Sequence, residues 1–266
     1  MDKKEQSVLI TGASRGIGAD LAVSFARAGY GMIGVNYIKD RDGAESVAAQ
    51  ITKENAKPEI IQADVSNRSE NEAMMKQFLD KFGRIDVLVN NAGGALKIPD
   101  GDFSEMPLDY WDSQIALNLS AAAYASHKAV RNMKENNIKG RIINISSIHG
   151  SVTWVKRKML PYMPAKAGLE MFTKALAVEV ARYGINVNAV APGFIMTRIS
   201  TRYTENEIAA FIRKIPVGRI GVTGDVSPLV LFLADDTLSR FIVGQTFTVD
   251  GGQSIDGVLD ETILPR

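Results

Sequence analysis

The chain has 266 residues, 45% of them hydrophobic and 23% charged, which is the composition of a globular protein with a sizeable core. A formal net charge of +1 argues against a nucleic-acid partner, and zero cysteines with two histidines argue against disulfides and against a metal site. No apolar run reaches the roughly 20 residues of a membrane helix, and MDKKEQ at the start lacks the apolar core of a signal peptide, so we expect a cytoplasmic protein without membrane contacts.

Seven short runs of mostly β-branched and other apolar residues predict β-strands along the chain. They are apolar throughout instead of alternating with polar residues, which is typical of strands buried on both faces of a parallel sheet. The predicted strands are 7–11, 31–37, 59–64, 85–91, 141–147, 185–192 and 246–252.

Helical patterns fill the segments between the predicted strands. After the first strand, Ile17, Leu21 and Phe25 recur on one helical face, and Gly29 provides a C-terminal cap. Strands and helices alternate without a linker, a repeat or a low-complexity tract. We therefore predict an α/β fold with a single doubly wound domain over residues 1–266, in which helices cover both faces of a parallel sheet of about seven strands.

Two further helices are predicted between the third and fifth strands. Ser69 and Glu72 have the spacing of a capping box at the start of the first of them. The second is the longest helical pattern of the chain, at about 108–137, and it places Trp111 and Ile115 in register.

The stretch TGASRGIG, residues 11–18, joins the first predicted strand to the first helix. In a doubly wound sheet this turn holds the pyrophosphate of a dinucleotide against the N-terminus of the helix. Gly12 would allow the sharp turn, Gly16 the approach of backbone to phosphate, and Gly18 the close packing of helix on strand. The spacing GxxxGxG differs from the GxGxxG dinucleotide fingerprint, so a glycine-rich turn without a ligand is the alternative.

A second group of polar residues lies far along the chain. The sequence YMPAK places Tyr162 and Lys166 four residues apart, on one face of a helix. Ser147 ends the strand before them, and Asn118 lies in the long helix expected to pack beside that strand. The alternatives are a half-buried phenol beside a solvated amine, and an asparagine that caps or bridges backbone groups.

These features make the chain similar to the short-chain dehydrogenase/reductase family, and the resemblance covers nearly its whole length. It implies a Rossmann fold and an oxidoreductase that moves a hydride between a nicotinamide and a carbonyl or secondary alcohol, with Asn118, Ser147, Tyr162 and Lys166 as the catalytic set. Further matching segments are ADV (63–65), NNAG (90–93), SS (146–147), APG (191–193) with Thr197, and GQTFTVDGG (244–252).

The chemistry of hydride transfer gives the predicted catalytic residues their roles. A carbonyl oxygen needs a proton donor, and an ammonium about 4 Å from a phenolate stabilises it by roughly 4 kcal/mol at an effective dielectric near 20, or about 3 pKa units. Lys166 can thus make Tyr162 a working acid or base, and Ser147 would hydrogen-bond the substrate oxygen. The resemblance implies that Asn118 holds a water linking Lys166 to solvent, and that Lys166 also binds the nicotinamide ribose.

Two features qualify the predicted position of the catalytic serine. Ser146 competes with Ser147 for the active role, but strand alternation sends the two side chains to opposite faces, and the family pattern favours the second. The gap between Ser147 and Tyr162 is longer than the family commonly has. The extra residues fall in HGSVTWVKRKMLP (149–161), so substrate contacts there cannot be transferred from the family.

The end of the second strand, VNYIKD, bears on the choice of cofactor. NAD-binding proteins commonly place an acid there, about 20 residues after the glycines, for the ribose 2′-hydroxyl. Asn36 and Tyr37 stand at that place, so a 2′-phosphate is not repelled, and Arg15 or Lys39 can pair with it. We predict NADP as the cofactor, with NAD as the alternative if Asp40 takes the role of the acid.

The resemblance implies further cofactor contacts at the ends of later strands. Asp64 and Val65 would flank the adenine, and Asn90, Ala92 and Gly93 the adenine ribose. The residues predicted to bind the cofactor, with the last two at the carboxamide, are Gly12, Ser14, Arg15, Gly16, Ile17, Gly18, Asn36, Tyr37, Asp64, Val65, Asn91, Ala92, Gly93, Tyr162, Lys166, Pro192, Gly193, Ile195 and Thr197.

Substrate contacts are expected in two segments. Residues 194–220 hold an amphipathic helical pattern, and in the family such a segment forms a lid over the substrate. We expect His149 to be held by backbone groups, with contact to the substrate as the alternative, while Trp154 and Met159 line an apolar pocket or pin the loop. Basic residues favour an anionic substrate or an acyl-carrier protein, unless they are simply solvated; they are Lys156, Arg157, Lys158, Arg198 and Arg202.

Two activities within the family fit the sequence. The chain resembles 3-oxoacyl-[acyl-carrier-protein] reductases in TGASRGIG and VNY, and glucose 1-dehydrogenases in NNIKGRIINISSIHG. We predict an NADP-dependent reductase of a small-molecule carbonyl or 3-oxoacyl substrate, with a sugar or polyol dehydrogenase as the alternative. A dinucleotide sensor without turnover is a third hypothesis, against which the complete set of Ser147, Tyr162 and Lys166 argues.

Family members are typically homotetramers, and the resemblance implies contacts through the helices at 108–137 and 162–183 and through the last strand. The run AAAYA at 121–125 suits close helix packing, either between subunits or within one. The tail at 253–266 either crosses to another subunit or ends as a frayed terminus.

Overall fold

The computed structural model describes residues 2–95, 102–153, 159–197 and 203–255 of the chain. Seven strands make up one sheet: β1 (Ser7–Ile10), β2 (Met32–Tyr37), β3 (Lys57–Gln62), β4 (Val87–Asn90), β5 (Arg141–Ile145), β6 (Asn186–Pro192) and β7 (Thr246–Val249). All neighbouring strands are parallel, in the order β3-β2-β1-β4-β5-β6-β7. The predicted parallel sheet is therefore confirmed, and each predicted strand overlaps an observed one.

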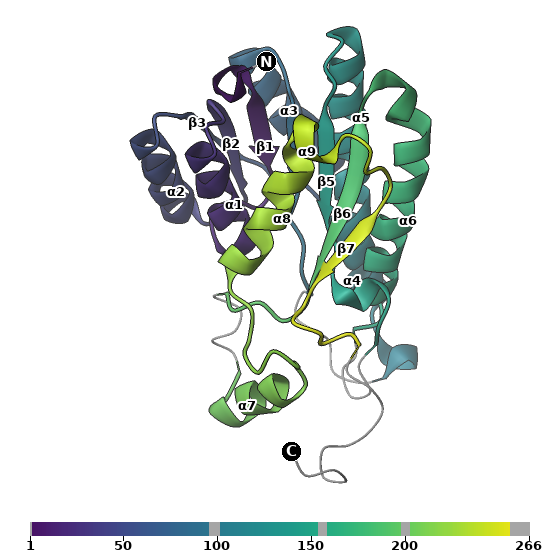
Figure 1. The fold of residues 1–266 in the computed structure, drawn as a ribbon. Coiled ribbons are helices and arrows are strands. Elements are labelled where there is room, and N and C mark those ends of the chain that lie inside the picture. The colour runs from purple at the N-terminus through teal and green to yellow at the C-terminus, as the bar shows by residue number, and fades with distance from the viewer. Residues whose placement is uncertain (1, 96–101, 154–158, 198–202, 256–266) are drawn as a thin grey trace.

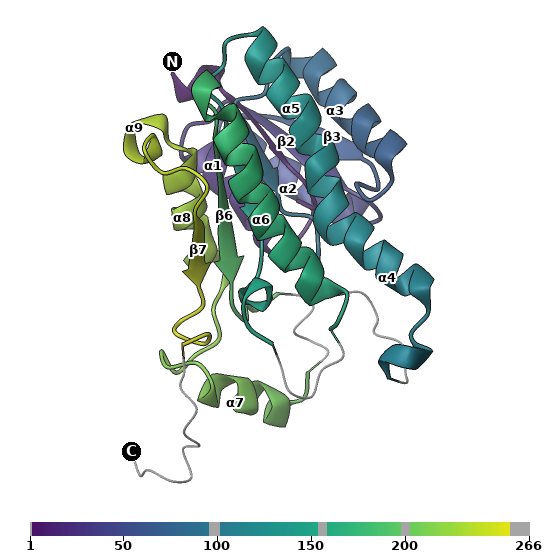
Figure 2. The same cartoon turned by 90° about the vertical axis from the view of Figure 1, so that its right-hand side faces the viewer.

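Helices cover both faces of this sheet, which confirms the doubly wound arrangement (Figures 1 and 2). They are α1 (Gly16–Arg27), α2 (Arg41–Lys53), α3 (Arg68–Phe82), α4 (Leu108–Ile115), α5 (Ala121–Glu135), α6 (Tyr162–Val180), α7 (Glu205–Arg213), α8 (Thr223–Ala234) and α9 (Asp236–Ser239). One face packs against α1, α2 and α8, and the other against α3, α5 and α6. Gly29 follows α1 in the left-handed region, at φ +92°, as its predicted role as a cap requires.

Burial follows the position of each strand in the sheet. Every residue of β1, β4, β5 and β6 is buried, as expected for central strands between two helical layers. The edge strands differ from the prediction of full burial, because β3 has one buried residue, Ile61, and β7 has none. An edge strand has a neighbour on one side only, so polar side chains such as Lys57 and Gln62 reach solvent there.

The start of α3 is set by a different residue from the one predicted. The Asn67 side chain accepts hydrogen bonds from the backbone N–H groups of Ser69 and Glu70, at 3.0 and 3.3 Å. The Glu72 carboxylate pairs instead with Arg68, at 3.3 Å. The predicted Ser69–Glu72 capping box is therefore wrong, since the amide oxygen of Asn67 already caps the first turn.

The long helix predicted at 108–137 is interrupted near its middle. A π-helical turn over Ala116–Ser120 joins α4 to α5. Such a turn inserts one residue into the α-helical ladder and is frequent at functional sites. It carries Asn118, whose side chain is buried.

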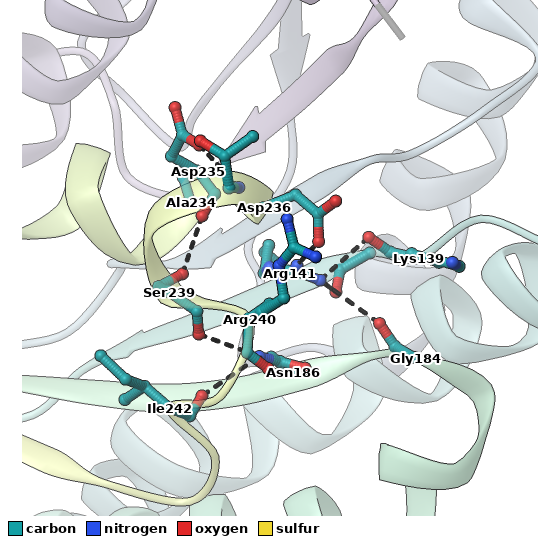
Figure 3. A network of polar contacts seen from close by, with 12 residues as sticks. Lys139, Arg141, Gly184, Asn186, Ala234, Asp235, Asp236, Ser239, Arg240 and Ile242 are labelled. Carbon is teal, nitrogen blue, oxygen red and sulfur yellow. Dashed lines mark hydrogen bonds and ion pairs between the residues drawn. The ribbon is translucent and has the colours of Figure 1, made fainter.

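A buried polar network ties the amino-terminal ends of β5 and β6 to α9 (Figure 3). Arg141 forms an ion pair with Asp236, the first residue of α9. The guanidinium also donates to three backbone carbonyls just before β5 and β6, those of Lys139, Gly140 and Gly184. The Asn186 amide donates to three more at and after the end of α9, those of Ser239, Arg240 and Ile242.

The opposite, carboxyl-terminal edge of the sheet carries the predicted site. The chain reverses the direction in which it adds strands between β1 and β4, and doubly wound sheets bind their ligands at such a switch point. The helix α7 lies beyond this edge in both views, apart from the two helical layers (Figures 1 and 2). Among the described helices, none combines the length and the apolar character needed to cross a membrane.

Candidate active site

Three chain segments predicted to bind a dinucleotide meet at the switch point. Gly12 and Gly16 have φ of +63° and +59°, a conformation that disfavours any side chain. A Cβ at Gly12 would lie 3.0 Å from the Cα of Ala92, and a Cβ at Gly16 would lie 3.4 Å from Cγ2 of Thr197. A Cβ at Gly18 would overlap the carbonyl oxygen of Gly12, so α1 and the turn before it pack more closely than a side chain allows.

Thr11 and Asn91 bind these segments to each other. The hydroxyl of Thr11 accepts hydrogen bonds from the backbone N–H groups of Asn91 and Ala92, at 3.0 and 2.9 Å. The Asn91 side chain donates to the carbonyl oxygens of Thr11 and Gly12, at 2.8 and 3.1 Å. Asn91 therefore shapes the glycine turn with its side chain, and Thr11, which the sequence analysis did not single out, shares this task.

Asn36 stands at the end of β2, where NAD-binding proteins carry an acid. Its side chain is 2% exposed. Its oxygen accepts from the backbone N–H of Gly12, at 3.0 Å, and its nitrogen donates to the carbonyl oxygens of Ile61 and Ala63, at 3.3 and 3.1 Å. Asn36 thus holds the glycine turn in place through its hydrogen bond with Gly12. Tyr37, which follows it, is also buried.

The charged residues near the end of β2 and the glycine turn differ in whether they already have a partner in the protein. Arg15 and Lys39 are both exposed to solvent. Asp40 caps α2 by accepting a hydrogen bond from the backbone N–H of Gly43, at 3.2 Å. A Cβ at Gly43 would come within 2.7 Å of the Ser14 carbonyl oxygen, so the start of α2 lies against the glycine turn. The carboxylate of Asp40 is therefore engaged by its own helix, whereas two cations lie at the surface beside the turn.

The predicted adenine contacts lie after β3. Asp64 accepts hydrogen bonds from the backbone N–H and the hydroxyl of Ser66, at 2.9 and 2.6 Å, and Val65 is buried. Val65, Ala92 and Asn118 are among the residues that line a small cavity at this edge of the sheet. Of the predicted residues on α1, Ile17 lies in the first turn and packs against the core.

The predicted catalytic residues converge at the start of α6. This helix begins at Tyr162, and the amine of Lys166 lies 5.8 Å from the centre of the Tyr162 ring. The same amine donates a hydrogen bond to the carbonyl oxygen of Ile145, the last residue of β5, at 2.8 Å. Ser147 forms a hydrogen bond with Tyr162 through its side chain. The spacing of Tyr162 and Lys166 thus places both on one helix face, beside the serine.

The electrostatics of this group differ from the expectation in one respect. Burial raises the pKa of the Tyr162 phenol, and the hydrogen bond with Ser147 lowers it only in part. The expected lowering of the Tyr162 pKa by the Lys166 ammonium is not among the causes of its shift; the amine lies 5.8 Å from the centre of the phenol ring and is itself buried. Burial lowers the pKa of Lys166 to about 8. The Tyr162 phenol therefore keeps its proton at neutral pH, whereas the Lys166 amine titrates at about pH 8.

Asn118 connects the π-helical turn to the loop after β4. Its side-chain oxygen accepts from the backbone N–H of Gly94, at 2.8 Å. Its side-chain nitrogen donates to the carbonyl oxygen of Gly94 at 3.2 Å and to the side-chain oxygen of Gln114 at 3.1 Å. A Cβ at Gly93 would lie 2.8 Å from the Asn118 oxygen and 3.1 Å from the Lys166 amine. Both polar groups therefore lie on the side of Gly93 where a side chain would stand, and glycine leaves room for them.

Both candidate serines contact α6. The strand β5 ends at Ile145, before either of them, so strand alternation does not send them to opposite faces. The Ser146 hydroxyl donates to the Glu170 carboxylate at 2.9 Å, while Ser147 pairs with Tyr162. Only Ser147 is thus in contact with the phenol, and Ser146 is engaged by an acid one turn beyond Lys166.

The loop after Ser147 is described in part. His149 is 9% exposed, and its Nδ1 lies 3.2 Å from the carbonyl oxygen of Val152, as expected for a histidine held by backbone. Met159 is buried. Trp154 and the basic residues Lys156, Arg157, Lys158, Arg198 and Arg202 lie outside the described residues.

The segment after β6 leads from the site to the predicted lid. Pro192 ends the strand, and the backbone N–H of Gly193 donates to the carbonyl oxygen of Val249, at 3.0 Å. Phe194 stacks on Phe211 of α7, with ring centres 4.4 Å apart. These contacts attach α7 to the loop that also carries two predicted carboxamide contacts, Ile195 and Thr197.

Gln114 and Glu170 are further polar residues of the site that the sequence analysis missed. Gln114 precedes Asn118 by four residues, and Glu170 follows Lys166 by four, so each repeats the helical spacing of a predicted residue. That spacing was the available signal. Within the described residues, no cluster of histidine and carboxylate side chains could hold a metal ion.

The fold and the relatives of this chain define an oxidoreductase that acts on a CH–OH or carbonyl group, with a nicotinamide cofactor implied. The chain belongs to the short-chain dehydrogenase/reductase family. A family model described as enoyl-(acyl carrier protein) reductase matches residues 12–254.

Individual relatives agree with this assignment. The chain is 41% identical to a 3-oxoacyl-[acyl-carrier-protein] reductase from Synechocystis over 247 residues, which cover 93% of this chain and 96% of the relative. A short-chain type dehydrogenase/reductase from Mycobacterium marinum superposes with a TM-score of 0.86 at 31% identity, covering 93% of this chain and 95% of the other. Acetoin dehydrogenase YohF from Salmonella typhimurium gives a TM-score of 0.86 at 30% identity, with 98% and 99% covered.

Proposed function

We propose that this protein is an NADP-dependent reductase of a carbonyl or 3-oxoacyl substrate, in which Tyr162 is the general acid. The observation that carries the proposal is the convergence of Ser147, Tyr162 and Lys166 at the start of α6, beside the Gly93 backbone. At neutral pH the Tyr162 phenol, whose pKa is raised by burial, carries the proton that a reduction requires.

The described residues fit a nicotinamide dinucleotide. The turn at Gly12 and Gly16 presents backbone without side chains at the N-terminus of α1, which suits a pyrophosphate. A bound nicotinamide would supply the hydride that reduces the carbonyl carbon. Gly93 belongs to the loop that we assign to the adenine ribose, and Ile195 and Thr197 belong to the loop that we assign to the carboxamide.

The chain's own side chains would move one proton per turnover. The Ser147 hydroxyl holds the substrate oxygen beside the phenol, and the Tyr162 O–H transfers its proton to that oxygen as negative charge develops. The Lys166 ammonium then returns a proton to Tyr162. Asn118, whose side-chain oxygen lies on the same side of Gly93 as the Lys166 amine, is assigned to the path by which the amine regains a proton from solvent.

The preference for NADP rests on the residues around the glycine turn. Asn36 carries no charge and its amide is used by backbone groups, so nothing at this point repels a 2′-phosphate. Arg15 and Lys39 are exposed there and can pair with it. Asp40, the acid that would favour NAD, is already the cap of α2.

We assign 3-oxoacyl thioesters as the substrate class on the strength of the Synechocystis relative. In this assignment α7 is a lid over the acyl chain, because its Phe211 stacks on Phe194 at the edge of the site. Sugar or polyol oxidation is the alternative, in which Tyr162 would accept the proton of the alcohol instead of donating one. A sensor without turnover would have no use for the Ser147–Tyr162 pair.

We further propose that residues 1–266 work as one catalytic domain in a homotetramer. Exposed apolar side chains on α6, Met171 and Val178, support an intersubunit role for that helix, with 62% and 82% of their surface accessible. The cytoplasmic location expected from the sequence stays a prediction.

The proposal is tested by following the nicotinamide absorbance with NADPH and NADH separately, against 3-oxoacyl thioesters, diketones, simple ketones and sugars. We expect turnover with NADPH on thioesters and a loss of at least about 100-fold in Tyr162→Phe, which lacks the proton to donate. Equal turnover in the variant would exclude Tyr162 as the acid. Tight NADPH binding with no turnover on any substrate would instead support the sensor hypothesis.

A further inference from the structure

Glu170 lies beside the proposed active site but has no part in the proton transfers described above. It follows Lys166 by one helical turn, so Tyr162, Lys166 and Glu170 repeat every four residues along one face of α6. The Ser146 hydroxyl donates to the Glu170 carboxylate at 2.9 Å and approaches the Lys166 carbonyl oxygen at 3.4 Å. The half-buried Glu170 carboxylate is thus held one helical turn from Lys166, the residue proposed to return a proton to Tyr162.

The turn after Ser147 lies directly against the Glu170 carboxylate. Residues Ile148–Gly150 form a short 3-10 turn that packs on α6. A Cβ at Gly150 would overlap the Glu170 carboxylate, so a side chain at this position would displace the acid from its place against the turn. Glu170 therefore contacts the chain on both sides of Ser147, at Ser146 and at Gly150.

The charges around Glu170 come from two elements. On α6 these are the ammonium groups of Lys166 and Lys174, and on the 3-10 turn the only titratable side chain is that of His149. Burial raises the pKa of the Glu170 carboxyl, whereas the hydrogen bond from Ser146 and the two lysines lower it. In the other direction, the negative charge of Glu170 raises the pKa of Lys166 against the effect of burial.

We propose that Glu170 is a positioning residue of the active site, which fixes the Ser147 turn on α6 through Ser146 and supplies the counter-charge that keeps Lys166 in its ammonium form. The catalytic meaning of this link rests on the proposed function, since an ammonium at Lys166 matters for turnover only if it returns a proton to Tyr162. In each reduction the Tyr162 O–H bond breaks as its proton moves to the substrate oxygen. A Lys166 N–H bond then breaks to give a proton back to the Tyr162 oxygen, and solvent protonates the amine again.

The link is tested directly by NMR titration of protein carrying ¹³C-labelled lysine, with the Lys166 signal assigned through its loss in Lys166→Arg. We expect Glu170→Gln to lower the titration midpoint of Lys166 by roughly one pH unit, because the negative charge one helical turn from Lys166 is removed. Glu179→Gln is the matched control, because it removes the same charge from an exposed site on α6 about 20 Å away. An unchanged midpoint in Glu170→Gln would overturn the proposal, whatever the effect on the melting temperature.

Kinetics then separate this inference from the proposed function. With wild-type turnover established, Glu170→Gln should move the alkaline limit of kcat/KM to lower pH by the same amount, and Ser146→Ala should reduce kcat about threefold to tenfold with little change in KM for NADPH. A shifted midpoint in a protein without reductase activity would reject the function and keep the Glu170–Lys166 link. Normal turnover with an unshifted profile in Glu170→Gln would reject the link and keep the function.

Discussion

At the scale of single residues, Lys166 is expected to set the pH range of the proposed reduction. Its pKa is lowered to about 8 by burial, so the ammonium is present below about pH 8 and is lost as the pH rises through that value. The pKa of Tyr162 is raised, so the phenol stays protonated across this window. We therefore expect kcat/KM for reduction to be level at neutral pH and to fall above about pH 8, as measured in initial-rate profiles.

Lys166→Arg provides the control for this assignment. An arginine holds its proton throughout the accessible range, so any activity that the variant retains should show no alkaline decrease near pH 8. If the decrease remains at the same pH in Lys166→Arg, the group that titrates is not Lys166.

Arg15 carries the second prediction at this scale, the preference for a 2′-phosphate. Removal of one charge-assisted hydrogen bond costs about 1.5–3 kcal/mol, so Arg15→Ala should raise the KM for NADPH roughly 10- to 100-fold and change that for NADH little. Arg27→Ala is the matched control, since this arginine lies at the other end of α1 and pairs with Glu54. Equal losses for both cofactors in Arg15→Ala would place the arginine away from the phosphate.

Individual residues could be predicted from the sequence where their spacing is local. Tyr162 and Lys166 are separated by one helical turn, and their shared face follows from that spacing alone. The partners of Asn36 could not be predicted, because its amide bonds join β2 to the glycine turn and to the chain after β3, 24 to 27 residues away. The distance between the Lys166 amine and the phenol likewise depends on the packing of α6 against β5.

At the scale of elements, the loop that carries Gly93 lies against both the π-helical turn with Asn118 and the helix α6 with Lys166. Gly93→Ala would introduce a Cβ 2.8 Å from the Asn118 oxygen and 3.1 Å from the Lys166 amine, so both side chains must leave their positions in the site. We expect at least a tenfold loss in kcat, with a smaller change in melting temperature, because the strain falls on the site. Gly224→Ala in α8 is the control, since its Cβ would meet no atom within 4 Å and activity should be retained.

The elements themselves were largely predictable, and their exceptions have physical causes. Apolar runs gave the seven strands in the correct order along the chain, but a run such as 59–64 does not state that its strand lies at a sheet edge. The cap of α3 was placed two residues late, because Asn67 and Ser69 are both favourable capping residues and only the backbone geometry selects one. The π-helical turn at Asn118 leaves no mark in the hydrophobic pattern.

At the scale of the whole molecule, the two edges of the sheet have different tasks. The carboxyl-terminal edge carries the glycine turns and polar side chains of the proposed site, whereas the amino-terminal edge is closed by the Arg141 network (Figure 3). This second edge contains a guanidinium that is almost completely buried, with its charge balanced by Asp236. Since the network lies at the other end of the strands, we expect it to govern stability without affecting turnover.

Asp236→Asn separates these two tasks in a single measurement. The substitution removes the counter-charge of a buried arginine, but the Asp236 side chain is 55% exposed and water screens the pair, so the cost should be about 1 kcal/mol. For a chain of this size that corresponds to a melting temperature lower by about 2–4 °C, with kcat and KM unchanged at 25 °C. Glu135→Gln, which breaks the fully exposed pair with Arg131, should leave both quantities unchanged. A loss of turnover in Asp236→Asn at a temperature where the protein stays folded would mean that the amino-terminal edge is coupled to the site through β5, the strand that begins at Arg141 and ends beside Lys166.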